Sequence, residues 1–159
     1  MSKAIFVRHA VALNRERAKA DGIADARRPL TAQGIRSFKK QVLKHKKLFK
    51  NVDLWVTSPY LRAKETLDII LEVLNIDEAQ ISILPKLIPE AEPELLLNWL
   101  AKRKERKIVL VSHEPFLSGF LTQYTAAGKR AKNVKKGAIA VVDIKSHNQK
   151  YILKGLFNP

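Results

Sequence analysis

The stretch IVLVSHEP, residues 108–115, decides the fold class of this chain. Its first four residues are apolar and mostly β-branched, and three polar residues separate them from Pro115, which can open a helix. A short apolar run of this kind is typical of a strand that is buried on both faces of a sheet. The polar residues between strand and helix then mark a position where chemistry can be placed.

Runs of the same kind recur along the chain and alternate with helix-like segments, which indicates an α/β protein. The runs in the middle of the chain are apolar and β-branched, so we expect those strands to be buried on both faces. The predicted strands are 4–7, 54–57, 81–84, 108–112, 138–144 and 151–157.

Helices are predicted from their start signals. Thr31 can cap a helix that carries an apolar stripe. The pair Ser58-Pro59 supplies a capping residue followed by proline at the first helical position, and Pro93 and Pro115 open two further helices. The segment 11–28 has many charges and no clear period, so it is expected to be a long loop, and loops of that length are often functional.

Length and composition limit the class of protein. With 159 residues, 46% hydrophobic and 28% charged, the chain fits one globular domain spanning 1–159. It has no cysteine, which excludes disulfides, thiolate metal sites and a cysteine nucleophile. No apolar run approaches the roughly 20 residues that span a bilayer. The apolar run near the N-terminus is too short for a signal peptide, so a cytoplasmic location is expected.

The charge balance is extreme, with 30 Lys and Arg against 15 Asp and Glu and a net charge of +15. This balance predicts attraction to polyanions. The basic residues gather in the blocks 39–50, 102–107 and 129–136. They can form an ordinary solvated surface, a surface that steers an acidic partner, or a nucleic-acid face. The last is possible but not favoured, because aromatic residues are not interleaved with the charges.

Three strand ends carry residues suited to chemistry. The first strand ends at Arg8 and His9, the second is followed by Ser58 with Arg62 one turn further on, and the fourth is followed by His113. In a mainly parallel sheet, ligands bind beyond the carboxyl ends of the strands. If these strands are parallel neighbours, two histidines and two arginines converge on one crevice.

Such a group of side chains suits a tetrahedral oxyanion. The guanidinium fork of arginine matches phosphate oxygens, and a neutral imidazole nitrogen can attack phosphorus and form a covalent intermediate. Arginines can supply the positive charge that phosphoryl transfer needs. The sequence contains no HExxH motif and no aspartate cluster suited to magnesium, and we expect neither a metal nor a cofactor.

The motifs resemble those of the histidine phosphatase superfamily, whose fold is phosphoglycerate-mutase-like. IFVRHA (5–10) resembles the Arg-His-Gly signature, RPLTAQG (28–34) the segment before the first long helix, SPYLRAKET (58–66) the second arginine motif, and VSHEP (111–115) the second histidine motif. KKGA (135–138) is similar to the SixA branch of phosphohistidine phosphatases. Together these motifs cover the chain from residue 4 to about 144.

The resemblance implies a role for each matching residue. His9 would accept the phosphoryl group, and Arg8 and Arg62 would hold its oxygens. His113 would donate to the phosphoryl group or stabilise the transition state, and Arg28 would add a substrate or phosphate contact. The implied fold is a three-layer α/β/α sandwich with a mixed, mostly parallel central sheet.

The chain also departs from the family pattern. Ala10 replaces the usual glycine after Arg-His, and it would be strained if the backbone angle φ were positive. The proton donor is open among Glu114, Glu90 and Glu92. A phosphoramidate needs less help from an acid, and the segment 75–107 is too short for a large specificity insertion. Both points favour a shallow, open pocket and a phosphate that is carried by a protein.

The sequence therefore predicts a metal-independent phosphatase that works through a phosphohistidine intermediate, with phosphohistidine in an acidic phosphoprotein domain as the preferred substrate. One alternative is a small-molecule or nucleotide phosphomonoesterase, which a competent carboxylic acid near the leaving oxygen would favour. Another is a non-catalytic module that binds phosphate or nucleic acid. A membrane partner is not expected.

Overall fold

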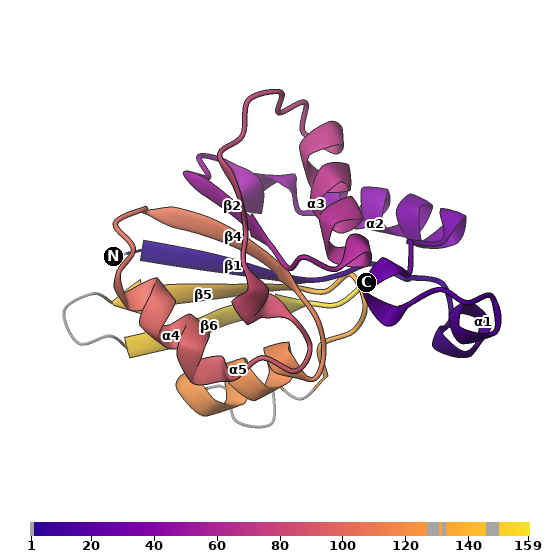
Figure 1. Ribbon diagram of the computed structural model, residues 1–159. Helices are drawn as coiled ribbons and strands as arrows, with labels where there is room; N and C mark the ends of the chain where they lie inside the picture. The colour runs from indigo at the N-terminus through magenta and orange to yellow at the C-terminus, as the bar shows by residue number, and fades with distance from the viewer. Residues whose placement is uncertain (1, 127–130, 132, 146–149) are drawn as a thin grey trace.

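A computed structural model describes residues 2–126, 131, 133–145 and 150–159. Six strands form one sheet in the order β3-β2-β4-β1-β5-β6 (Figure 1). Strands β1, β2, β3 and β4 run parallel, while β5 is antiparallel to both β1 and β6. The prediction of a mixed, mostly parallel sheet is therefore confirmed. The strands are β1 Ser2–Arg8, β2 Leu54–Thr57, β3 Ile81–Ile83, β4 Lys107–Ser112, β5 Ile139–Lys145 and β6 Lys150–Phe157.

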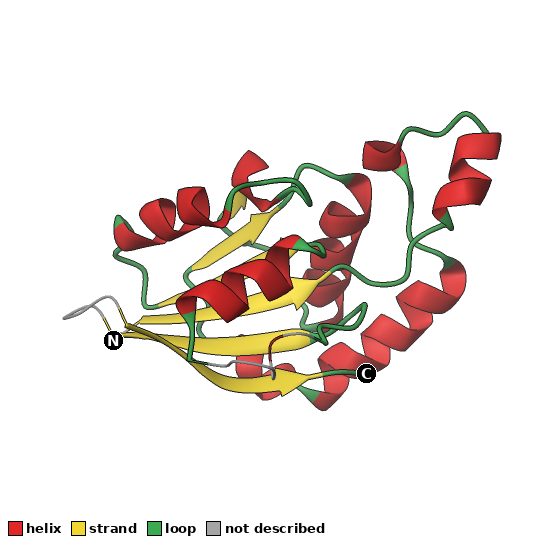
Figure 2. Cartoon of the chain, turned by 90° about the horizontal axis from the view of Figure 1, so that it is seen from below, coloured by secondary structure: helices red, strands yellow, loops and turns green. Residues whose placement is uncertain are grey.

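Helices cover both faces of the sheet, which gives the expected three layers (Figures 1 and 2). Helices α2 and α3 lie on one face and α4 and α5 on the other, while α1 lies beyond the end of the sheet, far from the N-terminus. The α-helices are α1 Arg15–Ala20, α2 Ala32–Lys44, α3 Leu61–Val73, α4 Pro93–Ala101 and α5 Phe116–Tyr124. The 3₁₀ helices whose bounds the described residues give are η1 Asp25–Arg27, η2 Lys46–Phe49 and η3 Pro85–Leu87.

The central strand β1 shows how the sheet is held between the two helical layers. Ala4 and Phe6 belong to the hydrophobic cluster that includes residues of α4 and α5, whereas Ile5 and Val7 belong to the cluster that includes residues of α2 and α3. Alternate side chains of a strand point to opposite faces of the sheet, so each helical layer packs against one face of β1. This double burial fixes β1 and the residues at its carboxyl end.

The third predicted strand differs from expectation. Strand β3 spans three residues, and the side chains of Ile81 and Ile83 are 48% and 55% exposed. The prediction that this run is buried on both faces is wrong. The physical reason is its position in the sheet. β3 is an edge strand that pairs with β2 on one side, so among the described residues its other side has no neighbouring strand.

The segment 11–28 is not the continuous loop that we predicted, because it contains α1 and η1. The side chain of Asn14 caps α1 by accepting hydrogen bonds from the backbone N–H groups of Glu16 and Arg17, at 2.8 and 3.2 Å. Gly22, with φ of +71°, follows the end of the helix. A capping asparagine and a left-handed glycine were thus the signals of a short helix.

The predicted helix starts hold at three of four places. Thr31 caps α2 with a 2.9 Å hydrogen bond from the Gly34 N–H, Pro93 is the first residue of α4, and Pro115 directly precedes α5. The start at Ser58-Pro59 is wrong, because α3 begins at Leu61 and Ser58 lies outside it. The Ser58 hydroxyl faces another partner instead, as described below.

Gly34 lets the first turn of α2 approach the chain that follows the first histidine motif. A Cβ atom added there would lie 2.2 Å from the backbone oxygen of Val11. We expect Gly34→Ala to lower the free energy of unfolding by about 1–3 kcal/mol, as overpacking does. In the matched variant Gly119→Ala, the new methyl meets no described atom within 4 Å, and we expect unchanged stability or a gain of about 0.5–1 kcal/mol. Urea unfolding measures both, and equal stabilities would contradict the close approach.

Candidate active site

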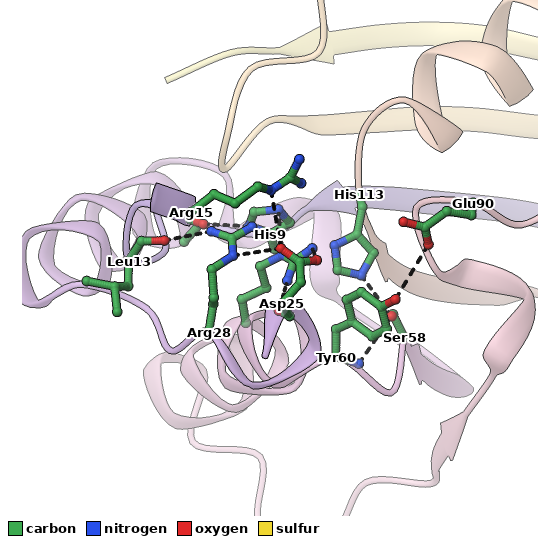
Figure 3. Close-up of polar contacts among 11 residues, drawn as sticks. His9, Leu13, Arg15, Asp25, Arg28, Ser58, Tyr60, Glu90 and His113 are labelled. Atoms are coloured by element: carbon green, nitrogen blue, oxygen red, sulfur yellow. Dashed lines mark hydrogen bonds and ion pairs between the residues drawn. The ribbon is translucent and has the colours of Figure 1, made fainter. Parts of the chain in front are cut away.

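The carboxyl ends of β1, β4 and β2 lie side by side and bring together residues that are far apart in the sequence (Figure 3). The imidazole rings of His9 and His113 have centroids 5.0 Å apart. The Nε of Arg62, from the first turns of α3, lies 3.2 Å from Nε2 of His9. The structure therefore places the two predicted histidines and Arg62 in direct contact.

The backbone fixes the orientation of His9. Its Nδ1 lies 2.7 Å from the carbonyl oxygen of Ala10, and because that oxygen can only accept, Nδ1 carries the proton. Nε2 is then the unprotonated nitrogen, and it accepts the hydrogen bond from Arg62 Nε–H. The side chain is 5% exposed. His9 thus presents a lone pair, at a defined nitrogen, beside a guanidinium group.

Ala10 fits its position without the glycine that the family pattern would place there. Among the described residues with a side chain, positive φ angles occur at Asn51 and Asn75, so Ala10 is not strained in that way. Its N–H donates to Oγ1 of Thr66 at 3.0 Å, and that hydroxyl donates to the carbonyl of Arg62 at 2.6 Å. The turn after His9 is therefore tied to the same helix that carries Arg62.

Both histidines are neutral near pH 7. Burial lowers the pKa of His9 to about 3, with further lowering by the positive charges of Arg62 and Arg8, against which the hydrogen bond to Ala10 acts. Burial also lowers the pKa of His113 to about 2, with smaller contributions from His9 and Arg62. A neutral imidazole is the form that can act as a nucleophile.

An NMR titration checks these two pKa values. A lowered pKa means that the neutral form persists to lower pH, so we expect the imidazole signals of His9 and His113 to stay unchanged from pH 8 to about pH 5. An exposed histidine, with a pKa near 6.5, would change most of its signal over that range. The unfolded chain binds protons below about pH 6.5 that the folded protein does not, so stability should fall as the pH drops below that value. Titration of His9 near pH 6.5 would contradict the burial argument.

His113 is held by the residue that we had assigned to a helix cap. Its Nε2 lies 2.8 Å from the hydroxyl oxygen of Ser58, and the side chain of His113 is fully buried. Tyr60 packs the edge of its ring against the imidazole at a centroid distance of 5.2 Å. Within the described part of the chain, Nδ1 of His113 has no hydrogen-bond partner. The contact with Ser58 alone does not fix which ring nitrogen carries the proton, because a hydroxyl can donate or accept.

A cavity of about 290 Å³ opens beside His9, and we call it the arginine cavity. Arg62 and Arg28, which line it, are 1% and 8% exposed. Arg8 also lines it and donates from an NH1 group to the carbonyl of Val134 at 2.8 Å. The cations on its wall are Arg8, Arg15, Arg28, Arg62 and Lys136, and Glu114 is the carboxylate among its lining residues. The balance of charge suits an anion.

The three predicted acids lie in different places. Glu114 lines the arginine cavity, and its carboxylate accepts hydrogen bonds from the N–H and the hydroxyl of Ser118, at 2.9 and 2.6 Å. Glu90 is exposed, and its carboxylate accepts the Tyr60 hydroxyl at 3.5 Å (Figure 3). Glu92 is exposed at the start of α4. Geometry thus separates Glu114 from the other two.

Sequence reasoning missed Asp25, which contacts two of the predicted arginines. Its carboxylate accepts hydrogen bonds from Arg62 at 3.2 Å and from Arg28 Nε at 2.9 Å (Figure 3). It also missed the partnership of Ser58 with His113. Neither contact can be predicted from neighbouring residues. Asp25 lies in a segment without a hydrophobic period, and it contacts Arg62 of α3, which is 37 positions further along the chain.

The described residues include no group of three or more His, Asp or Glu side chains that could hold a metal ion. Within the same residues, no helix has the length and apolar character needed to cross a membrane.

Residues 4–88 match the family model of the histidine phosphatase superfamily (branch 1), and the chain belongs to this family. Within the family it is of the SixA type. It is 29% identical to the phosphohistidine phosphatase SixA of Escherichia coli (strain K12). The alignment spans 132 residues and covers 80% of each chain. The resemblance read from the motifs is therefore confirmed.

Solved structures show the same fold. A structure of the protein histidine phosphatase SixA complexed with tungstate matches with a TM-score of 0.81 and 22% identity, over 99% of this chain and 97% of that one. A phosphoglycerate mutase from Plasmodium falciparum matches with a TM-score of 0.63 and 18% identity, over 97% and 89%. The three-layer, phosphoglycerate-mutase-like fold is confirmed. The family to which the chain belongs is one of phosphatases.

Proposed function

We propose that the whole chain is one catalytic domain, a metal-independent phosphatase that transfers a phosphoryl group to His9 and then to water. The observation that carries this proposal is the unprotonated Nε2 of His9 beside the arginine cavity. The cavity's five cations balance the phosphoryl charge without a step that needs a metal.

In the first step, the hydrogen bond from Arg62 Nε–H to His9 Nε2 breaks and frees the lone pair of that nitrogen. The lone pair attacks phosphorus, the P–Nε2 bond forms, and the bond from phosphorus to the leaving group breaks. The leaving atom takes a proton from solvent or, for an ester oxygen, from a carboxylic acid of the site. In the second step, a water molecule attacks phosphorus, the P–Nε2 bond breaks, and inorganic phosphate leaves with His9 neutral again. Splitting one displacement into two is the usual benefit of a covalent intermediate.

The other site residues stabilise the phosphoryl group during both steps. Arg8, Arg28 and Arg62 offer N–H groups to its oxygens from the walls of the arginine cavity. The Ser58 hydroxyl can donate to Nε2 of His113, and His113 then keeps its proton on Nδ1, the buried nitrogen without a described partner. From there it would donate to a phosphoryl oxygen.

The substrate that we propose is phosphohistidine in a protein. The SixA relative is named for this activity. The leaving nitrogen of a phosphoramidate is readily protonated, so such a substrate needs little from an acid. Arg15 and Lys136 line the arginine cavity, and Lys19 lines a hollow that shares Arg15 and Arg28 with it, so both spaces have basic side chains on their walls. This charge would steer an acidic phosphoprotein domain.

Two predictions from the sequence are not tested by the structure. Of the third basic block, Lys129, Arg130 and Lys132 lie outside the described residues. The cytoplasmic location also stays a prediction.

A panel of substrates tests the proposal. We expect kcat/KM on a phosphohistidine protein to exceed that on phosphoserine or a sugar phosphate by about 10²-fold or more. It should fall as salt rises from 50 to 500 mM, because salt screens charge steering, whereas hydrolysis of a small aryl phosphate should change little. A preference for small phosphates would favour the monoesterase. Tight binding with no phosphate release from any substrate would favour the non-catalytic module.

The monoesterase alternative depends on Glu114, the carboxylate on the wall of the arginine cavity. We predict that Glu114→Gln lowers kcat about 10²-fold on phosphoserine, whose alkoxide needs a proton, and less than about threefold on phosphohistidine. Steady-state rates on both substrates provide the measurement. Glu72→Gln, at an exposed pair with Lys39, is the control. If Glu90→Gln or Glu92→Gln shows the selective loss instead, the acid is not Glu114.

A further inference from the structure

The geometry points to Asp25 as a positioning residue that fixes the arginines of the site. The inference rests on the proposed function, because it assigns how the residues around His9 are held. It concerns a side chain that no motif of the sequence singled out.

Arg62 is held from two sides. Its Nε donates to Nε2 of His9 at 3.2 Å, and its two terminal nitrogens donate to the backbone oxygen of Asp25 at 2.7 Å and to the carboxylate of Asp25 at 3.2 Å. The guanidinium plane is thus defined by the nucleophile at one edge and by Asp25 at the other. Each terminal nitrogen keeps a second N–H for a ligand.

The same carboxylate also holds two other arginines. Its second oxygen lies 2.9 Å from Nε of Arg28 and 3.3 Å from Nε of Arg15 (Figure 3). Burial alone would raise the pKa of Asp25, but the hydrogen bond from Arg28 and the charge of Arg62 hold it below its ordinary value. One ionised carboxylate therefore joins α1, η1 and α3.

Asp25 lies beside the arginine cavity and does not line it. It lines the adjacent hollow of about 420 Å³, which we call the α1 hollow, whereas Arg15 and Arg28 line both spaces. Its carboxylate lies among Arg15, Arg28 and Arg62, and it offsets the repulsion among these three guanidinium groups.

Removing the charge of Asp25 tests this role. In Asp25→Asn, we expect kcat to fall about 30-fold, and by no less than tenfold. Loss of a residue that supports a site residue typically lowers activity 10–100-fold, because small displacements weaken contacts in the transition state. KM should change less than about threefold, because the cations remain. Asp21→Asn is the matched control, since it removes the same charge from an exposed pair with Arg17 in the same segment, and we expect its kcat within twofold of wild type.

A double-mutant cycle separates positioning from general stability. Part of the effect of Asp25 passes through Arg62 and part through Arg28 and Arg15, so the loss of kcat caused by Asp25→Asn should be at least threefold smaller beside Arg62→Ala than in the wild type. A loss in Asp25→Asn smaller than tenfold relative to Asp21→Asn, or a loss that persists in full beside Arg62→Ala, overturns the inference. Should Asp25→Asn not fold, Asp25→Glu decides: a kcat at least threefold below that of Asp21→Asn supports positioning, and any smaller loss overturns it.

The two proposals can fail separately. Suppose that the wild-type protein forms phosphohistidine at His9 and that the kcat of Asp25→Asn is within tenfold of that of Asp21→Asn. This result would overturn only the role of Asp25. A wild-type protein without phosphatase activity would overturn the proposed function itself.

Discussion

Replacement of His9 by alanine lowers kcat at least about 10⁴-fold on every phosphorylated substrate, because the variant has no atom that can form the covalent intermediate. The arginine cavity remains in this variant, so binding of inorganic phosphate should survive. Stopping the reaction rapidly with denaturant at alkaline pH and measuring protein-bound phosphate should show a phosphoprotein in the wild type and none in His9→Ala.

His45 provides the control for this experiment. It follows α2, its ring packs on Phe157 at a centroid distance of 4.7 Å, and it is not among the residues that line the arginine cavity. We expect His45→Gln to keep kcat within about twofold of wild type. Substantial turnover by His9→Ala would show that His9 is not the acceptor, whatever the cavity binds.

Arg62→Ala should lower kcat/KM about 10³-fold. Arg62 is 1% exposed, touches Nε2 of His9 and lines the arginine cavity, so its charge acts where solvent is excluded. Arg62→Lys should recover less than about tenfold of this loss, since an ammonium group lacks the planar fork that reaches His9 and Asp25 together. Steady-state kinetics on an aryl phosphate measure both variants.

Arg17→Ala is the matched control for Arg62, because Arg17 is an exposed arginine paired with Asp21. It should keep kcat/KM within about twofold. Full activity in Arg62→Lys would show that charge alone matters at this position and would contradict a directional role for the guanidinium group.

Much of the site could be predicted because its residues follow strands whose order is constrained. Apolar runs ending in Arg8-His9 and in His113 had to be parallel neighbours for their side chains to meet, and β1 and β4 do pair in parallel. Burial then follows, because both strands lie in the middle of the sheet. The lowered pKa values of His9 and His113 come mainly from this burial.

The remaining contacts depend on how one segment folds back, and local sequence does not encode that. Asp25 reaches Arg62 because α1 and η1 return residues 11–28 to the start of α3. Ser58 carries a sequence signal for a helix cap, but burial beside His113 gives its hydroxyl a different partner. Tertiary contacts override local signals at such positions.

The most direct measurement is the location of the phosphoryl group in the trapped intermediate, by tandem mass spectrometry for the residue and by ³¹P NMR for the nitrogen. The account predicts one phosphoryl group per chain, attached to Nε2 of His9. A phosphoryl group on any other side chain, or steady turnover with no phosphorylated protein at any time, would contradict it.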